Sequence, residues 1–168
     1  LATIRQGLYD FQGSMQDNPG RCNLHDYGGI QLLLDFGHNP HGVRAMLNMA
    51  RGLMAERSTA RLWVSLGQAG DRSDSDLMGL AQAVLEAEPD QVSLREVAGY
   101  ERGRQPGEVT GFIRRILVEN GQSQDCIWHH DDEVSALEDA LEWASPGDLV
   151  VHLVHIQRDA VQTLLNRR

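Results

Sequence analysis

The chain has 168 residues, of which 41% are hydrophobic, and its formal net charge is −9 at pH 7. This length allows one domain with a sizeable core, and the acidic balance argues against a nucleic-acid-binding surface, which is usually a basic stripe. All fifteen basic residues are arginines, which excludes chemistry that needs a lysine of this chain, such as a P-loop lysine or a Schiff base.

The first predicted element is a helical segment, LATIRQGLYDF (1–11), and the turn-rich stretch QGSMQDNPG (12–20) follows it. Because the sequence starts at a leucine, we expect it to be a piece of a longer protein. Residues 1–19 then form a helix and linker from a preceding domain, and residues 20–168 form one domain. Next come two strands, RCNLHDY (21–27) and IQLLLDF (30–36), with Gly28 and Gly29 between them as a hairpin turn.

From residue 30 onward, strands and helices alternate. The pattern predicts further strands over 61–67, 91–96, 125–130 and 148–154, and helices over 40–56, 75–88, 106–120, 132–144 and 157–168. We therefore expect an α/β, Rossmann-like fold: a mostly parallel sheet of about six strands with helices on both faces and an antiparallel N-terminal hairpin. In such sheets, ligands bind beyond the carboxyl ends of the strands.

The loop DFGHNPHG (35–42) carries more polar chemistry than a strand-to-helix connection needs. Asn39 can cap the following helix, and Pro40 suits its first position, so a structural role accounts for both residues. That role leaves Asp35 and His38 unexplained. A carboxylate at a strand end is well placed to accept hydrogen bonds from ribose hydroxyls, so we interpret this loop as a candidate nucleotide contact.

Two later loops are candidates for binding an anion. In SLGQAGDRSDSD (65–76), a glycine turn places Asp71 and Arg72 ahead of a helix that Ser73 or Ser75 should cap. The Asp71–Arg72 pair is either a weak surface salt bridge or a clamp for a substrate carboxylate. In YERGRQPGE (100–108), two arginines precede Glu108 at the start of a helix, which indicates either an anion-binding loop or an ordinary polar loop.

The stretch WHHDDE (128–133) suggests a metal site at first sight. However, neighbouring strand residues point to opposite faces, so His129 and His130 should not bind one ion, and Asp131 or Asp132 is expected to cap the next helix. Cys22 and Cys126 have no CxxC partner, and no apolar run approaches the roughly 18 residues of a membrane span. We expect reduced thiols in a cytoplasmic protein that contacts neither membrane nor nucleic acid.

Taken in order, these motifs resemble the C-terminal domain of the Mur ligase superfamily, which includes folylpolyglutamate synthetase, and the nearest likeness is to the cyanophycin synthetase type. The resemblance covers nearly the whole chain. It is carried by NPGR (18–21), DFGHNPHG (35–42), GDRSDSDL (70–77), RGRQPGE (102–108) and SPGDLVV (145–151).

The resemblance implies an ATP-dependent amide ligase, in which ATP phosphorylates a carboxylate and the amine of an incoming amino acid or peptide attacks the acyl phosphate. This domain would be a mobile lid on a central ATPase domain, which binds most of the Mg²⁺ and supplies the catalytic residues. The implied nucleotide contacts are Arg21, Asp35, His38 and Asn39. The implied contacts to the acceptor amino acid are Asp71, Arg72, Arg102, Arg104 and Glu108.

Three departures from the family pattern have consequences. Phe36-Gly37 replaces the commoner Tyr-Ala, which should alter packing rather than ligand contacts. The Asp-Asn-Pro-Arg motif of the diaminopimelate-adding ligases is absent, which counts against that substrate. Without lysine, the domain should not ligate alone. Two alternatives stay open: a free-standing module that binds a nucleotide or amino acid, and a scaffold domain that has lost ligand binding.

Overall fold

A six-stranded sheet in the order β1-β2-β6-β3-β4-β5 forms the middle layer of the fold. The structure is a computed structural model that describes residues 21–55 and 59–166. Its strands are β1 (Asn23–Tyr27), β2 (Ile30–Asp35), β3 (Leu62–Leu66), β4 (Gln91–Arg95), β5 (Ile127–His130) and β6 (Leu149–Leu153). β1 pairs with β2 in antiparallel orientation, and all other neighbours are parallel. The predicted fold class is confirmed, whereas the expected helix and linker over 1–19 lie outside the described residues.

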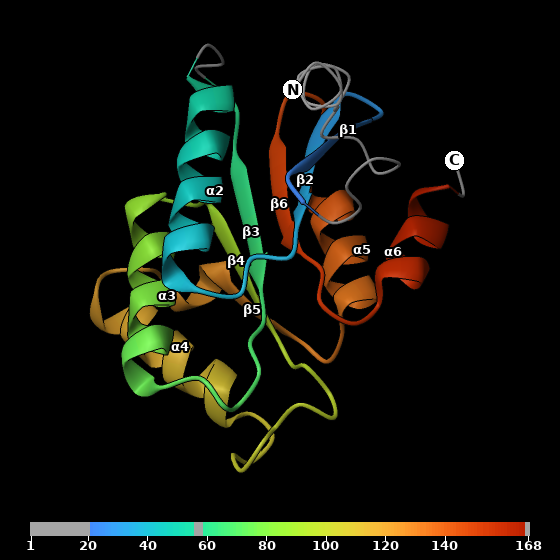
Figure 1. The fold of residues 1–168 in the computed structure, drawn as a ribbon. Helices are drawn as coiled ribbons and strands as arrows, with labels where there is room; N and C mark the ends of the chain where they lie inside the picture. The colour runs from blue at the N-terminus through green and yellow to red at the C-terminus, as the bar shows by residue number, and fades with distance from the viewer. Residues whose placement is uncertain (1–20, 56–58, 167–168) are drawn as a thin grey trace, which may run out of the picture.

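Helices cover both faces of this sheet (Figure 1). α2 (Pro40–Met54), α3 (Asp74–Glu86) and α4 (Glu108–Glu119) lie on one face, and α5 (Glu133–Trp143) and α6 (Arg158–Leu165) lie on the other. A 3-10 turn at Gln124–Cys126 leads into β5. The caps set the helix starts. Ser73 rather than Ser75 caps α3, and α4 begins two residues later than predicted because Gly107 has a left-handed φ of 81°.

The predicted hairpin turn between β1 and β2 is confirmed. Gly28 and Gly29 have φ values of 63° and 89°, and Tyr27 pairs with Ile30 across them. A two-residue turn with positive φ at both central residues matches the twist of the flanking strands, and glycine adopts it without steric cost.

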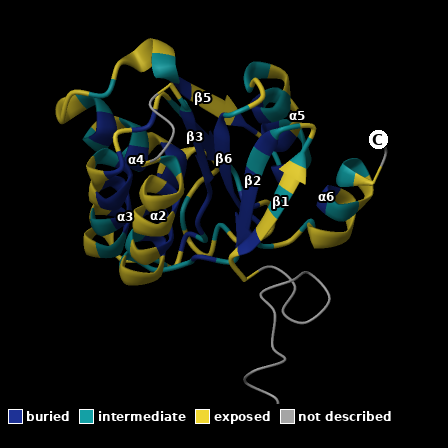
Figure 2. Cartoon of the chain, turned by 90° about the horizontal axis from the view of Figure 1, so that it is seen from above, coloured by how far each residue is buried: buried dark blue, intermediate teal, exposed yellow. Residues whose placement is uncertain are grey.

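Alternate residues of the strands fill two separate cores. Leu33 of β2 packs toward α2, α3 and α4, whereas its neighbours Leu32 and Leu34 pack toward α5 and α6. Figure 2 shows this burial in the central strands, with exposed residues on the outer helical surfaces. Within the described residues, none of the helices has the length and apolar character that crossing a membrane requires.

Three tryptophans meet on the α5 side of the sheet. Trp63 is fully buried, and its ring centroid lies 5.5 Å from that of Trp128 and 5.5 Å from that of Trp143. The guanidinium of Arg61 covers the Trp143 ring at 4.1 Å. Tilted aromatic contacts of this kind add to the stabilisation from burial alone.

A buried carboxylate next to this cluster binds residues at the amino ends of the parallel strands. Asp148 accepts hydrogen bonds from the backbone N–H and Nε of Arg61 at 2.9 and 3.1 Å, and from the Ser145 N–H at 2.9 Å. Burial raises the pKa of Asp148, but the hydrogen bonds from Arg61 and Ser145 outweigh burial, and the pKa is lowered overall.

Candidate functional site

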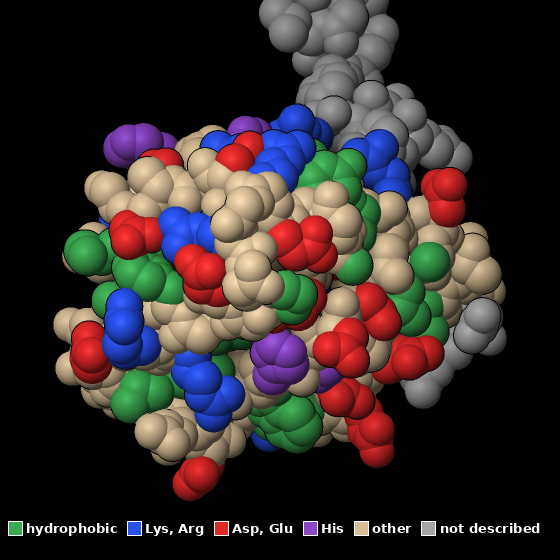
Figure 3. Space-filling view, turned by 90° about the horizontal axis from the view of Figure 1, so that it is seen from below, with side chains coloured by type: hydrophobic (Ala, Val, Ile, Leu, Met, Phe, Trp, Pro, Cys, Tyr) green, Lys and Arg blue, Asp and Glu red, His purple; other side chains and the backbone are tan. Residues whose placement is uncertain are grey.

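Four loops meet at the carboxyl ends of the parallel strands and enclose a pocket. The loops after β2, β3 and β4 turn back at the lower end of the sheet in Figure 1, and the loop after β6 joins them. The cavity is about 330 Å³ and is lined by Phe36, His38, Gln68, Ala69, Arg72, Val97, Tyr100, Arg102, His155 and Ile156. Figure 3 views the molecule from this side, where arginine, histidine and hydrophobic side chains lie next to one another. Pockets at this place in open parallel sheets bind ligands.

Three of the predicted site residues line this pocket, and they come from both predicted groups. Arg72 and Arg102 were expected to contact the acceptor, whereas His38 was expected to contact the nucleotide. His38 Nδ1 lies 3.2 Å from the carbonyl oxygen of Phe36, and Nε2 has no hydrogen-bond partner among the described residues. The structure therefore groups His38 with the acceptor candidates.

The other three nucleotide candidates lie outside the pocket lining. The Asp35 carboxylate is largely buried, and its Oδ2 accepts a hydrogen bond from the backbone N–H of Cys22 at 2.8 Å. The guanidinium of Arg21 lies over the Phe36 ring at 5.1 Å. Asn39 Oδ1 accepts from the Gly42 N–H at 2.9 Å, so Asn39 caps α2 as its sequence position predicts.

Asp35 also changes the chemistry of a neighbouring thiol. Burial, followed by the negative charge of Asp35 and a hydrogen bond to Asp35, raises the pKa of Cys22 to about 11. Sγ of Cys22 lies 3.4 Å from Asp35 Oδ2. The Cys22 thiol is therefore protonated at neutral pH, which makes it a poor nucleophile.

Asp71 pairs with Arg102 across the pocket rim. Arg102 Nη1 donates to Asp71 Oδ2, and this hydrogen bond is the main reason that the pKa of Asp71 is lowered. Arg72 Nε lies 3.8 Å from the other Asp71 oxygen, is buried, and makes no hydrogen bond within the described part of the chain. Arg72 thus has donor capacity left for a ligand.

Arg104 links the two loops, and neither Arg104 nor Glu108 is part of the pocket lining formed by the described residues. Arg104 donates to the carbonyl oxygens of Gly70 and Arg72, both at 3.0 Å, and to Asp74 at 2.6 Å. It also pairs with Glu108 at 3.1 Å. Arg104 therefore contacts the loop that carries Arg72, and Glu108 contacts Arg104.

A glycine allows the same two loops to approach closely. The Gly70 N–H donates to the Tyr100 carbonyl oxygen at 2.8 Å. A Cβ atom at residue 70 would lie 1.7 Å from the Glu101 carbonyl oxygen, which is far inside van der Waals contact. Only glycine fits here without displacing the backbone of the second loop.

Sequence reasoning missed several pocket residues, above all His155. Its Nδ1 lies 3.1 Å from Arg95 Nη2, its Nε2 lies 3.0 Å from the Gly37 carbonyl oxygen, and its ring meets Phe36 edge-on at 5.2 Å. The rule that selected Asp35, a polar residue just after a buried strand, also applies to His155 after β6. Phe36 lines the cavity, so it is available for ligand contacts as well as packing.

The residues of WHHDDE have structural partners. His130 lies on the buried face, between Ser93 Oγ at 2.8 Å and Asp139 Oδ2 at 2.9 Å, whereas His129 is half-exposed. Asp132 caps α5 by accepting from the Ser135 N–H at 2.9 Å. Among the described residues, no group of three histidine, cysteine or acidic side chains is arranged to hold a metal ion.

Comparisons with known proteins agree with the observed fold and also identify a protein family. The family model "Mur ligase, glutamate ligase domain" matches residues 20–153. The chain is 34% identical to cyanophycin synthetase of Synechocystis sp. over 170 residues, which is 100% of this chain and 18% of that protein. It is 29% identical to UDP-N-acetylmuramyl-tripeptide synthetase of Latilactobacillus sakei over 90% of this chain and 27% of that protein.

Among solved structures, the chain is similar to a bifunctional folylpolyglutamate synthase/dihydrofolate synthase from Yersinia pestis, crystallised with AMPPNP and a manganese ion. The TM-score is 0.67 with 22% identity, and the match covers 97% of this chain and 34% of that one. An identity this low shows a shared fold. The chain spans about a fifth of the length of the cyanophycin synthetases that it matches.

Proposed function

This chain belongs to the Mur ligase family, in its glutamate ligase domain, and we propose from this that it is the C-terminal, ligand-contacting domain of an ATP-dependent amide ligase. The parent enzyme would be of the cyanophycin synthetase or Mur ligase type. In that reaction, a carboxylate is activated as an acyl phosphate, the amine of an incoming amino acid or peptide attacks it, and phosphate leaves. This domain would work against the central ATPase domain of the parent chain.

The observation that carries the proposal is Arg72, a pocket arginine whose guanidinium donates no hydrogen bond to the described residues. A guanidinium presents paired N–H donors in a planar fork that matches a carboxylate. We assign Arg72, with Arg102 beside it, to the carboxylate of the incoming amino acid. His38 lines the same cavity and is assigned to orienting the acceptor.

The nucleotide is assigned to the adjoining surface of Arg21, Asp35 and Asn39. Asp35 Oδ2 is used by Cys22, while Oδ1 makes no hydrogen bond within the described residues and is available to a ribose hydroxyl. A carboxylate oxygen without a partner is the acceptor that a ribose hydroxyl needs, so these residues fit a nucleoside. For Mg²⁺ the described residues offer no three-ligand group. ATP supplies the phosphoryl group for activation, and the metal belongs to the central domain.

The proposal predicts binding without turnover. The isotope-labelled 168-residue chain is titrated with each of the common L-amino acids and with Mg-AMPPNP, and amide chemical shifts are followed by NMR. We expect an amino acid to shift the loops around Arg72 and Tyr100, and Mg-AMPPNP to shift the loop around Asp35. The chain alone should form no amide from ATP, because it contains no lysine for a phosphate-binding loop. Ligase turnover by the chain alone, or no response to any of these ligands at millimolar concentration, would contradict the proposal.

A further inference from the structure

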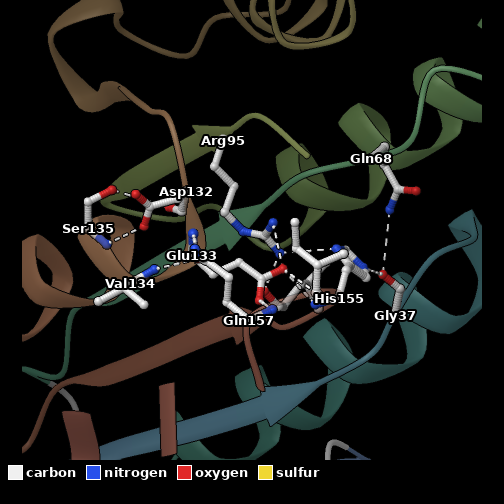
Figure 4. Close-up of polar contacts among 11 residues, drawn as sticks. Gly37, Gln68, Arg95, Asp132, Glu133, Val134, Ser135, His155 and Gln157 are labelled. Atoms are coloured by element: carbon white, nitrogen blue, oxygen red, sulfur yellow. Dashed lines mark hydrogen bonds and ion pairs between the residues drawn. The ribbon is translucent and has the colours of Figure 1, made fainter. Parts of the chain in front are cut away.

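Two opposite charges lie buried together beneath the pocket. Arg95 at the end of β4 is 0% exposed, and Glu133 at the start of α5 is 1% exposed. Arg95 Nη1 and Glu133 Oε1 are 3.1 Å apart (Figure 4). Two charges removed from water lower the stability of a fold unless each has excellent partners, so a buried pair is weak evidence of a stabilising role.

Glu133 binds the backbone of the loop after β6. Its Oε1 accepts the N–H groups of His155 and Ile156 at 2.7 and 3.0 Å, and its Oε2 accepts that of Gln157 at 2.8 Å. The Gln157 side chain in turn accepts the Glu133 N–H at 2.7 Å. Because His155 and Ile156 line the pocket, this carboxylate holds one wall of the pocket in place.

Arg95 determines where His155 carries its proton. Its Nη2 donates to the Leu153 carbonyl oxygen and lies 3.1 Å from His155 Nδ1. A guanidinium only donates, so Nδ1 must accept, and the ring proton is on Nε2, which donates to the Gly37 carbonyl oxygen at 3.0 Å. Both ring nitrogens are used, and the ring presents carbon atoms to the pocket.

We propose that Arg95 and Glu133 are positioning residues for this pocket: Arg95 holds His155 as an uncharged Nε2–H imidazole, and Glu133 holds the backbone of residues 155–157. This wall of the pocket then has a single conformation, and its imidazole is neutral, before a ligand arrives. Such preorganisation lowers the free-energy cost of binding. This proposal rests on the proposed function, in which an acceptor amine enters the pocket. That amine then meets no imidazolium at this wall. The positive charge of the pocket stays with Arg72 and Arg102.

The charged and titratable groups around His155 favour this state. Burial lowers the pKa of His155 most, the Arg95 cation lowers it further, His38 adds a smaller lowering effect, and the Gly37 carbonyl and Glu133 oppose them, which leaves the pKa at about 4. His152, three residues earlier in β6, is fully buried, and burial lowers its pKa well below the ordinary value, so it is also neutral. Arg95 itself has a pKa lowered by burial to about 10, so it stays charged at neutral pH.

The test reads the His155 ring directly by ¹⁵N NMR of the 168-residue chain, with His155→Asn to assign the signal. The wild type should show the Nε2–H pattern and no titration between about pH 5 and 8. Arg95→Met should raise the pKa of His155, because the cation is lost and Glu133 remains. Arg95→Lys keeps the positive charge and should keep the pKa of His155 low, although lysine cannot make all the contacts of the guanidinium to Leu153, His155 and Glu133. A merely structural arginine would give the same ring signal in all folded variants.

A second measurement, amide hydrogen exchange, tests the role of Glu133 in holding the backbone. It also tests the proposal if Arg95→Met does not fold. Glu133→Gln replaces one acceptor oxygen by an N–H donor that faces the Gln157 N–H, so amide exchange at residues 155–157 should rise by about tenfold or more. The matched control is Arg61→Met, which also removes the partner of a buried carboxylate, Asp148, but at the amino ends of the strands. It should lower the melting temperature while leaving the His155 ring and these amides unchanged.

In the full-length enzyme that carries this chain, Glu133→Gln should raise KM for the acceptor and leave KM for ATP unchanged. The inference is overturned by an Nδ1–H ring, by a wild-type titration midpoint near the ordinary histidine value, by equal changes in the Arg61→Met control, or by an unchanged acceptor KM. The ring and exchange measurements use no ligand. Their failure is therefore distinguishable from a failure of the proposed function, which the amino-acid titration decides.

Discussion

The carboxylate of Asp71 is hydrogen-bonded by Arg102, 31 residues away, whereas its neighbour Arg72 makes only a longer ion-pair contact with it. Arg72 Nε stays 3.8 Å from Asp71 and has no hydrogen bond among the described residues. The sequence left open whether Asp71 and Arg72 form a surface salt bridge or a ligand clamp. This geometry supports the clamp, because the acid is already neutralised from the other loop and the adjacent guanidinium keeps its donors.

Replacing Arg72 by lysine should weaken acceptor binding with little effect on stability. An ammonium cannot reproduce a planar two-point contact to a carboxylate, whereas the long Asp71 contact is too weak to affect unfolding measurably. Acceptor KM in the full-length enzyme and the melting temperature of this chain give the two readings. Arg44→Lys, which alters an exposed pair with Glu86 between α2 and α3, is the control. A large melting shift with normal acceptor kinetics would return Arg72 to a structural role.

Gly70→Ala should separate the loops after β3 and β4. Its new Cβ atom would meet the Glu101 carbonyl oxygen at 1.7 Å, so one backbone must move and the pocket rim opens. We expect a lower melting temperature and weaker amino-acid binding together. Gly111→Ala is the matched control, since its Cβ meets no atom within 4 Å and alanine favours a helix interior by about 1 kcal/mol. If Gly70→Ala melts like the wild type, the close approach of the loops is wrong.

Asp35→Ala should raise KM for ATP in the full-length enzyme while kcat changes less. A ribose contact is made in the ground state and the transition state alike, so its loss acts on binding. The expected loss is about 1.5–3 kcal/mol, the range for a hydrogen bond to a charged group. Unchanged ATP dependence in a folded variant would remove Asp35 from the nucleotide site.

Cys22 should alkylate slowly, and Asp35→Asn should speed it up. The raised pKa of Cys22, about 11, keeps the thiolate scarce at pH 8. The amide removes the negative charge that disfavours the thiolate, so the pKa of Cys22 falls. Mass spectrometry of iodoacetamide-treated protein follows both cysteines, with Cys126 as the internal reference. Equal rates at Cys22 in the two proteins would contradict the Asp35 contact.

Asp148→Asn should destabilise the chain in a pH-dependent way. The lowered pKa of Asp148 means that its charge stabilises the fold above the ordinary carboxyl pKa, and that this stabilisation is lost as pH falls through the folded-state pKa. Urea unfolding followed by circular dichroism should show a loss of about 2 kcal/mol near neutral pH that shrinks at acidic pH. A difference independent of pH would indicate lost packing rather than lost charge.

The fold could be read from the sequence because apolar periodicity and strand–helix alternation are local signals. Helix starts were less certain. Ser73 and Ser75 both suit a cap, and only the path of the loop selects Ser73. Three of the four loops around the pocket were also predicted, since the ends of parallel strands converge whatever the side chains are, whereas the loop after β6 was missed.

The partners of individual charged residues could not be read in the same way. Arg104 reads as an anion-binding arginine, but its partners lie on a loop about 30 residues earlier, at Gly70, Arg72 and Asp74. Arg95 reads as the polar end of a strand, and Glu133 as a first-turn helix acid. Their burial against each other depends on how α5 packs on β4, which no local pattern encodes.

All three tryptophans of the chain sit in one corner, around Trp63 on the α5 side of the sheet. Intrinsic fluorescence therefore reports on that corner, and a melt followed by emission would record the separation of α5 from the sheet. Events in the loops around Tyr100 and Arg72 would pass unseen in such a melt. Tyr100→Trp would place a chromophore at the pocket rim, so that loop opening and loss of the sheet could be followed as two separate optical signals in one sample.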